Sequence, residues 1–223
     1  ARPELAHVQT IARARRAAPL STLGTMLVDV MHRVPPDVVL PPLVGTYVSL
    51  NLYLAVVGVS GQGKDTSDGA AEDGLVSDTP VRKIPMGTGE GLVKNYVEYG
   101  EDPETGETGI IQHQTAAVVI ASEVDKLAAI AKRQGSTLMP NLRDGWTGKR
   151  IGSGNSGAEF RLWVEPHRYR LGVVVGVQPG RGAALLNPDE VAGGTPQRFL
   201  ARSRDQALER RLKDDTRSCY AEQ

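Results

Sequence analysis

Residues 50–66 read Leu-Asn-Leu-Tyr-Leu-Ala-Val-Val-Gly-Val-Ser-Gly-Gln-Gly-Lys-Asp-Thr, an apolar run followed by a glycine-rich turn and a lysine. The turn matches the G-x-x-x-x-G-K pattern of a phosphate-binding loop, with Gly58 and Gly63 at the fixed glycines and Lys64 at the lysine. Backbone N–H groups converge on a phosphate in such a loop, and glycine reaches the required backbone angles without strain. The stretch therefore predicts a buried strand, a phosphate-binding loop and a helix whose N-terminal end faces the same anion.

One position departs from this pattern. The pattern has Ser or Thr directly after the lysine as a ligand of Mg²⁺, whereas this chain has Asp65, followed by Thr66. A carboxylate also ligates Mg²⁺, but it places negative charge beside a triphosphate, so the sequence leaves the metal ligand open between the two residues. The alternative to a nucleotide site is a glycine-rich structural corner with a surface lysine. The residues expected to contact the nucleotide are Gly58, Ser60, Gly61, Gln62, Gly63, Lys64, Asp65 and Thr66.

The composition suits one α/β domain with a sizeable core, because the chain has 223 residues and 40% of them are hydrophobic. The 26 Lys and Arg residues balance the 26 Asp and Glu residues, so no global positive field indicates nucleic acid, although a local patch is compatible with it. Cys219 is the single cysteine, which excludes an internal disulfide and suggests a reducing compartment. The sequence has no run of about 18 apolar residues, so we expect no membrane partner and a cytoplasmic location.

The chain divides into three predicted parts. Residues 1–44 form a helical lead-in, with helices expected at 4–18 and 21–34 from their apolar periodicity. Residues 45–201 form the core around the phosphate-binding loop. Residues 202–223 are highly charged with few apolar anchors and form a solvated tail.

Three apolar segments predict the main strands of the core: 45–59, 116–121 and 169–177. The second and third are apolar almost throughout, as in strands that are buried on both faces of a parallel sheet. Alternating strands and helices predict an α/β fold, an open and mostly parallel sheet between two layers of helices. Ligands bind at the carboxyl ends of the strands in such sheets, where we expect the loop and the polar residues 122–125 and 178–181.

The remaining elements are expected from local composition. Residues 98–115 are rich in Glu, Asp, Gly and Thr and predict an exposed hairpin with its turn at Pro103–Gly106. Residues 193–200 are expected to close the ordered part of the chain, with the turn around Arg198 starting a helix. We also expect a short strand at 81–84, a strand at 160–164 at the edge of the sheet, and helices at 64–74, 86–97, 122–135 and 138–146.

An acidic residue follows the strand at 116–121. Glu123 stands where a carboxylate polarises an attacking water molecule or holds Mg²⁺ through water, and Asp125 is the alternative. A structural interpretation is also available, in which Ser122 caps the next helix and the two acids occupy its first turn. Together with the phosphate-binding loop, we favour Glu123 as a functional acid.

Other polar residues near strand ends suggest further roles. Gln178 ends the strand at 169–177, where an amide can sense a γ-phosphate or position water. Arg198 can stabilise charge on a transferred phosphoryl group, in the same chain or across a subunit interface, and a surface ion pair is its structural alternative. Arg181 is a weaker candidate for that role. Glu90 is a second candidate acid.

Several stretches resemble the P-loop ATPase domain of uncharacterised primase–helicase-type proteins found in actinobacteria, their phages and plasmids. These proteins belong to the RecA-like group that includes replicative helicases. The more specific matches are the Gly-Val-Gln-Pro stretch at 176–179 and the Thr-Pro-Gln-Arg-Phe stretch at 195–199. The matching stretches span most of the chain before Arg202; they are Leu40–Gly45, Ser49–Asn51, Val57–Lys64, Gly87–Leu92, Gly135–Leu138, Gly176–Pro179 and Gly193–Phe199.

The resemblance implies a three-layer RecA-like fold, ATP and Mg²⁺ as cofactors, a homo-oligomeric ring and a DNA substrate. It implies phosphate contacts at Gly61, Gly63 and Lys64. The expected catalytic residues are Lys64, Glu123, Gln178 and Arg198, and the expected metal ligands are Asp65, Thr66 and Glu123.

We therefore expect an ATP-hydrolysing motor domain, helicase-like and acting on DNA in replication. Two alternatives come from other classes of protein. One is a nucleotide-binding interaction module with little or no hydrolysis, which Asp65 favours. The other is a small-molecule phosphotransferase, for which the loop at 151–158 is the candidate lid.

Overall fold

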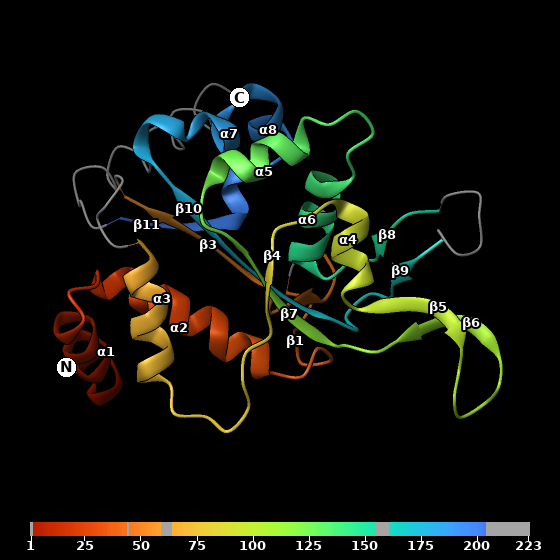
Figure 1. The fold of residues 1–223 in the computed structure, drawn as a ribbon, viewed down its shortest axis with the longest axis horizontal. Helices are drawn as coiled ribbons and strands as arrows, with labels where there is room; N and C mark the ends of the chain where they lie inside the picture. The colour runs from red at the N-terminus through yellow and green to blue at the C-terminus, as the bar shows by residue number, and fades with distance from the viewer. Residues whose placement is uncertain (1, 44, 59–63, 155–160, 204–223) are drawn as a thin grey trace.

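Five parallel strands form the central sheet in the computed structural model of the chain, which describes residues 2–43, 45–58, 64–154 and 161–203 (Figure 1). Their spatial order is β11-β3-β10-β7-β4. The strands are β3 (Leu52–Val57), β4 (Lys83–Pro85), β7 (Ala116–Ala121), β10 (Arg170–Val177) and β11 (Phe199–Ser203). The three apolar strands β3, β7 and β10 lie inside the sheet, which confirms the prediction of a mostly parallel sheet with buried central strands.

One face of the sheet is covered by the helices that follow β4 in the chain. These helices are α4 (Gly89–Lys94), α5 (Val124–Ala131), α6 (Leu138–Thr147), α7 (Ala183–Leu186) and α8 (Pro188–Ala192). Alternate strand residues pack against them in the larger apolar core, because successive side chains of a strand point to opposite faces. The strand residues of this core are Tyr53, Ala55, Val57, Ala117, Val119, Ala121, Leu171, Val173, Val175 and Val177.

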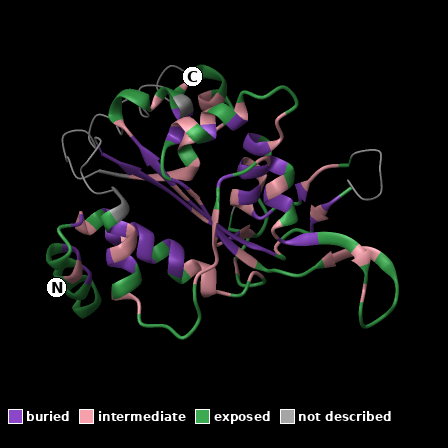
Figure 2. Cartoon of the chain, viewed as in Figure 1, coloured by how far each residue is buried: buried purple, intermediate pink, exposed green. Residues whose placement is uncertain are grey.

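The other face is covered by the N-terminal helices. α2 (Pro19–Arg33) lies directly on the sheet, where its Val28 packs against Leu54 and Val118. α1 (Pro3–Ala14) and α3 (Lys64–Gly74) pack on α2. The chain therefore has three layers, with the buried strands in the middle (Figure 2).

Three two-stranded antiparallel ribbons complete the fold. β5 (Val97–Glu101) and β6 (Thr108–Gln112) form the exposed hairpin that the sequence predicts, and it projects from one end of the molecule (Figure 1). The other ribbons are β1 (Val39–Leu40) with β2 (Val48–Ser49) and β8 (Ile151–Gly152) with β9 (Trp163–Val164). None of the described helices has the length and apolar character needed to cross a membrane.

The structure corrects several boundaries. The helix predicted over residues 4–18 ends at Ala14, and Arg16 has a left-handed φ of 53° that ends the helical path. The helix predicted over 86–97 is only α4, because Val97 already pairs with Gln112 in the hairpin.

Two predictions about strands were wrong. β9 pairs with β8 and not with the edge of the main sheet. Phe199, directly after Arg198, begins a fifth parallel strand instead of a helix, so the ordered sheet extends past the predicted core boundary at residue 201. The short run Phe-Leu-Ala-Arg-Ser has little strand signal of its own and becomes a strand by pairing with β3.

Candidate functional site

The carboxyl edge of the sheet lies where the sequence places the phosphate-binding loop. β3 ends at Val57, and the N–H group of Gly58 donates to the carbonyl oxygen of Val177 in β10 at 3.0 Å. α3 then begins at Lys64, which confirms the predicted strand before the loop and the helix after it. Ser60, Gly61, Gln62 and Gly63, together with the side chains of Lys64 and Asp65, lie outside the described residues. Thr66 is exposed in the first turn of α3.

The strand register brings Glu123 and Gln178 to the same edge. Val57 is paired with Val177 in β10, and Ala121 with Val175, so the residue two places after Ala121 is level with the end of β3. Gln178 directly follows Val177. Since β10 lies between β3 and β7, the backbone of Glu123 is two strand spacings from the loop strand, about 10 Å.

The Glu123 side chain is exposed and uncommitted within the described part of the chain. Glu123 is the N-cap residue of α5 in extended conformation, and its side chain makes no capping bond. Ser122 is therefore not the capping residue, whereas Asp125 occupies the first turn of α5 as the structural interpretation predicts. The carboxylate opens onto a hollow of about 540 Å³ along the edge strand β4, which is lined by Lys83, Ile84, Pro85, Ile120, Ser122, Glu123 and Lys126.

The other candidate acids are placed differently. Asp125 is engaged with Arg181, whose Nη1 lies 2.7 Å from its Oδ2, and both side chains are partly exposed. Glu90 is exposed at the start of α4, where Thr88 caps the helix by accepting from the N–H group of Gly91 at 3.1 Å. Glu90 lines a separate hollow between α4, α6 and β8, not the one beside Glu123.

Arg198 lies at the opposite end of the sheet. Its neighbour Phe199 pairs with Tyr53 at the beginning of β3, whereas the loop follows the end of that strand. The Arg198 guanidinium donates to the carbonyl oxygen of Gly194 and stands 5.8 Å from the ring centre of Trp146. The fold does not bring Arg198 together with Glu123 and Gln178 in one chain, which does not support its predicted role toward a nucleotide bound by the same chain.

A cluster of charged residues lies beneath α3 and was not anticipated. The ammonium group of Lys83 in β4 lies 2.6 Å from Asp68 and 2.7 Å from Glu72 of α3, and 4.0 Å from Asp29 of α2. Asp29 is buried, and its Oδ1 has no hydrogen-bond partner among the described residues. The sequence feature that could have indicated this cluster is an aspartate on the otherwise apolar face of a predicted helix. Its partner Lys83 is distant in sequence, so the pairing itself could not be predicted.

The buried carboxyl of Asp29 makes the stability of the folded chain depend on pH. Burial raises the pKa of this carboxyl from 3.8 to about 6, although Lys83 opposes the shift. Because the folded state binds this proton more tightly than the unfolded state, the group destabilises the fold increasingly as pH rises from about 4 to 6, and fully above that. At 1.36 kcal/mol per unit the cost is about 2 to 3 kcal/mol at pH 8.

We therefore expect Asp29→Asn to raise the free energy of unfolding at pH 8 by up to about 2 kcal/mol, and the gain to disappear near pH 4. Chemical denaturation at the two pH values measures it. Asp78→Asn, at an exposed position, is the control and should change stability by less than about 0.5 kcal/mol at either pH. A gain that persists unchanged at pH 4 would contradict the titration of Asp29.

Comparison with models of known protein families gives no match, and comparison with curated proteins gives no significant similarity. The case for function therefore depends on the residues of the carboxyl edge.

Proposed function

We propose that this chain is an ATP-binding and ATP-hydrolysing domain with a RecA-like fold, helicase-like and acting on DNA in replication. The observation that carries the proposal is the convergence of three segments at one edge of a parallel sheet. The glycine-rich loop sequence begins there at Gly58, directly after β3. The next two strands across the sheet, β10 and β7, are followed at the same edge by Gln178 and Glu123. A nucleotide phosphate bound by the loop would have an acid and an amide within reach.

The order of the strands supports the RecA-like fold. Counted along the chain the strands lie in the order 5-1-4-3-2, which differs from the doubly wound orders of dinucleotide-binding and flavodoxin-like sheets. It places one strand between the loop strand β3 and the acid-bearing strand β7. The resulting gap of about 10 Å leaves room for a terminal phosphate and a water molecule between the loop and Glu123.

The oxygen groups at this edge fit the ligand preference of Mg²⁺, which takes carboxylate and hydroxyl oxygens. Glu123 offers a carboxylate that is uncommitted in the described part of the chain, and Thr66, an exposed residue at the start of α3, carries a hydroxyl. Asp65 is the further candidate ligand. Bound Mg²⁺ would neutralise phosphate charge, while Lys64 binds the phosphates, Gln178 senses them and Glu123 orients and deprotonates water.

The test is ATP binding and hydrolysis by the purified chain, with and without DNA. Lys64→Ala is expected to weaken ATP binding about tenfold or more and to reduce hydrolysis to background, because the variant loses a charge-assisted contact to the phosphates. Lys132→Ala, an exposed lysine at the end of α5, is the matched control and should leave both unchanged. If the unmodified chain hydrolyses ATP at the background rate in both conditions, the motor proposal fails.

Asp65 favours a second candidate, a nucleotide-binding interaction module. A carboxylate in place of the usual hydroxyl weakens the case for productive metal binding beside the triphosphate. Such a module would bind ATP tightly, associate in an ATP-dependent manner and release no phosphate. Sedimentation with and without ATP, combined with a phosphate-release assay, separates it from the motor.

Subunit association and DNA binding are also part of the proposal. Arg198 would act on the nucleotide of an adjacent subunit, since the fold places it far from the edge that carries Glu123 in its own chain. ATP hydrolysis that rises with protein concentration and with added DNA would support this arrangement.

A further inference from the structure

The helix that follows the candidate loop has little apolar packing. α3 has the sequence Lys-Asp-Thr-Ser-Asp-Gly-Ala-Ala-Glu-Asp-Gly, in which Ala70 and Ala71 are the only residues with apolar side chains, and both are buried against α1 and α2. Burying one methyl group contributes about 0.8 kcal/mol, whereas Gly69 within the helix costs nearly 1 kcal/mol relative to Ala. Polar contacts must therefore contribute much of the free energy that holds α3 in place.

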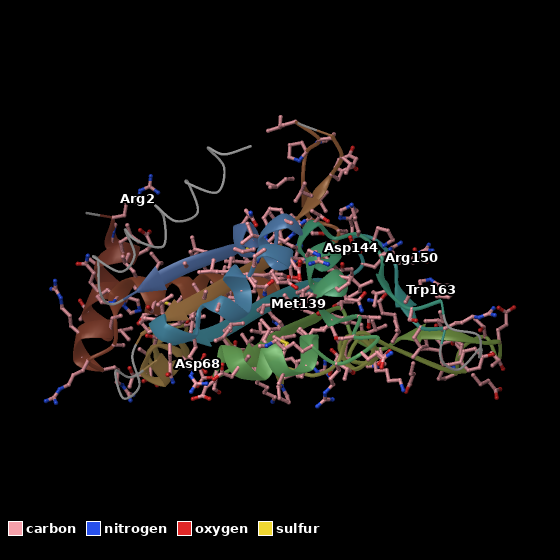
Figure 3. All side chains as sticks on the ribbon, turned by 90° about the horizontal axis from the view of Figure 1, so that it is seen from above. Arg2, Asp68, Met139, Asp144, Arg150 and Trp163 are labelled. Atoms are coloured by element: carbon pink, nitrogen blue, oxygen red, sulfur yellow. The ribbon has the colours of Figure 1, made fainter. Side chains whose placement is uncertain are left out.

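The strongest polar contacts of α3 come from the edge of the sheet. Asp68, which is labelled in Figure 3, and Glu72 are four residues apart and share one face of the helix. The ammonium of Lys83 donates to both carboxylates, at 2.6 and 2.7 Å. The Lys83 side chain is only 19% exposed, so water screens these pairs less than ordinary surface pairs.

Two further polar contacts of α3 lie at its C-terminal end. Asp73 is paired with Arg15, the residue directly after α1, and both side chains are about half exposed. The Gly74 carbonyl oxygen lies 3.2 Å from Nε2 of His7. These contacts join α3 to α1, another surface helix, whereas Lys83 joins it to a strand of the central sheet.

We propose that Lys83 is a positioning residue: it fixes α3 against the sheet and thereby sets the affinity for ATP. The part concerning ATP rests on the proposed function. Asp68 is four residues after Lys64, about 6 Å along the helix, so any movement of α3 at Asp68 displaces the first turn. That turn carries Lys64 and Thr66 and must stay aligned with Gly58 and with Glu123, which lies in the same hollow as Lys83.

The first readout needs no nucleotide. In Lys83→Met, which retains length and removes charge, we expect backbone amides of α3 to exchange hydrogen about tenfold faster or more, because local opening of the helix becomes easier. The control Lys132→Met should leave the exchange unchanged. Lys83→Arg, which keeps a cation, should retain most of the protection.

The second readout is kinetic. We expect Lys83→Met to raise KM for ATP about tenfold while kcat changes less than about threefold, since binding geometry is affected and the water-activating group is not. Because Lys83→Met also removes the cation with the largest effect on the buried Asp29, the double variant Asp68→Asn/Glu72→Gln removes the same contacts on the α3 side and keeps Lys83. It should reproduce the effect, and combining it with Lys83→Met should add little.

Unchanged exchange in α3 in both variants would overturn the proposal, as would a fall in kcat at constant KM. If the unmodified chain bound no ATP, the proposed function would fail and with it the part concerning affinity. The exchange measurement would still decide whether Lys83 fixes α3.

Discussion

Replacing Glu123 by Gln is expected to lower kcat for ATP hydrolysis by about 100-fold or more, the range seen when a general base is removed. The amide keeps the size of the side chain but cannot accept a proton from water. Glu123 is exposed at the end of β7, so the change should leave the fold intact. ATP affinity should stay within about threefold, because in the proposed site the loop and Lys64 provide most of the phosphate contacts.

Asp125→Asn is the matched control for this prediction. Its carboxylate lies two residues away but is engaged by Arg181 at 2.7 Å, so its loss should change kcat less than about threefold. Single-turnover hydrolysis and a binding measurement with a non-hydrolysable ATP analogue distinguish chemistry from affinity. A large loss in Asp125→Asn together with normal turnover in Glu123→Gln would reverse the assignment of the acid.

The second large effect is expected at Arg170, the first residue of β10, whose side chain is buried. Its Nε donates to the carbonyl oxygen of Val34 at 3.2 Å, and its Nη2 donates to those of Pro35 at 2.5 Å and Val38 at 3.0 Å. These hydrogen bonds connect residues 34–38, which follow α2, to the central strand β10. Burial lowers the pKa of Arg170 below its usual value, and the guanidinium serves as the donor for the three carbonyl oxygens.

Arg170→Met should lower the free energy of unfolding by about 3 kcal/mol. Three carbonyl groups lose their hydrogen-bond donor, which costs about 1 to 3 kcal/mol each. The variant no longer has a guanidinium to desolvate on folding, and this offsets part of the cost. For a domain of this size the change corresponds to a fall in Tm of roughly 6 to 12 °C. The exposed neighbour Arg168 provides the control, since Arg168→Met should shift Tm by about 1 °C at most. Equal shifts in the two variants would show that the buried hydrogen bonds do not stabilise the fold.

The sequence allowed the centre of the fold to be predicted because the information there is local. β3, β7 and β10 are continuous apolar runs, and a strand buried on both faces requires that composition. The hairpin of β5 and β6 was predicted from its turn residues for the same reason. Polar residues directly after the buried strands then place Glu123 and Gln178 at the carboxyl edge, since the strands are parallel.

The edge strands were harder to predict because their pairing is not local. β11 carries a weak strand signal and forms only because β3, far away in sequence, offers an unpaired edge. The same pairing puts Arg198 at the amino end of the sheet, away from the residues with which the sequence groups it.

The sequence alone therefore determined the buried strands, the position of the loop and the acid and amide beside it, because composition and order along the chain specify them. Only the tertiary structure decided which charges meet. Lys83 lies beside Asp29, Asp68 and Glu72 because α2 and α3 pack over the edge of the sheet. Charged residues that are distant in sequence have no shared pattern, so their partners are set by the packing of the layers and not by the local chain.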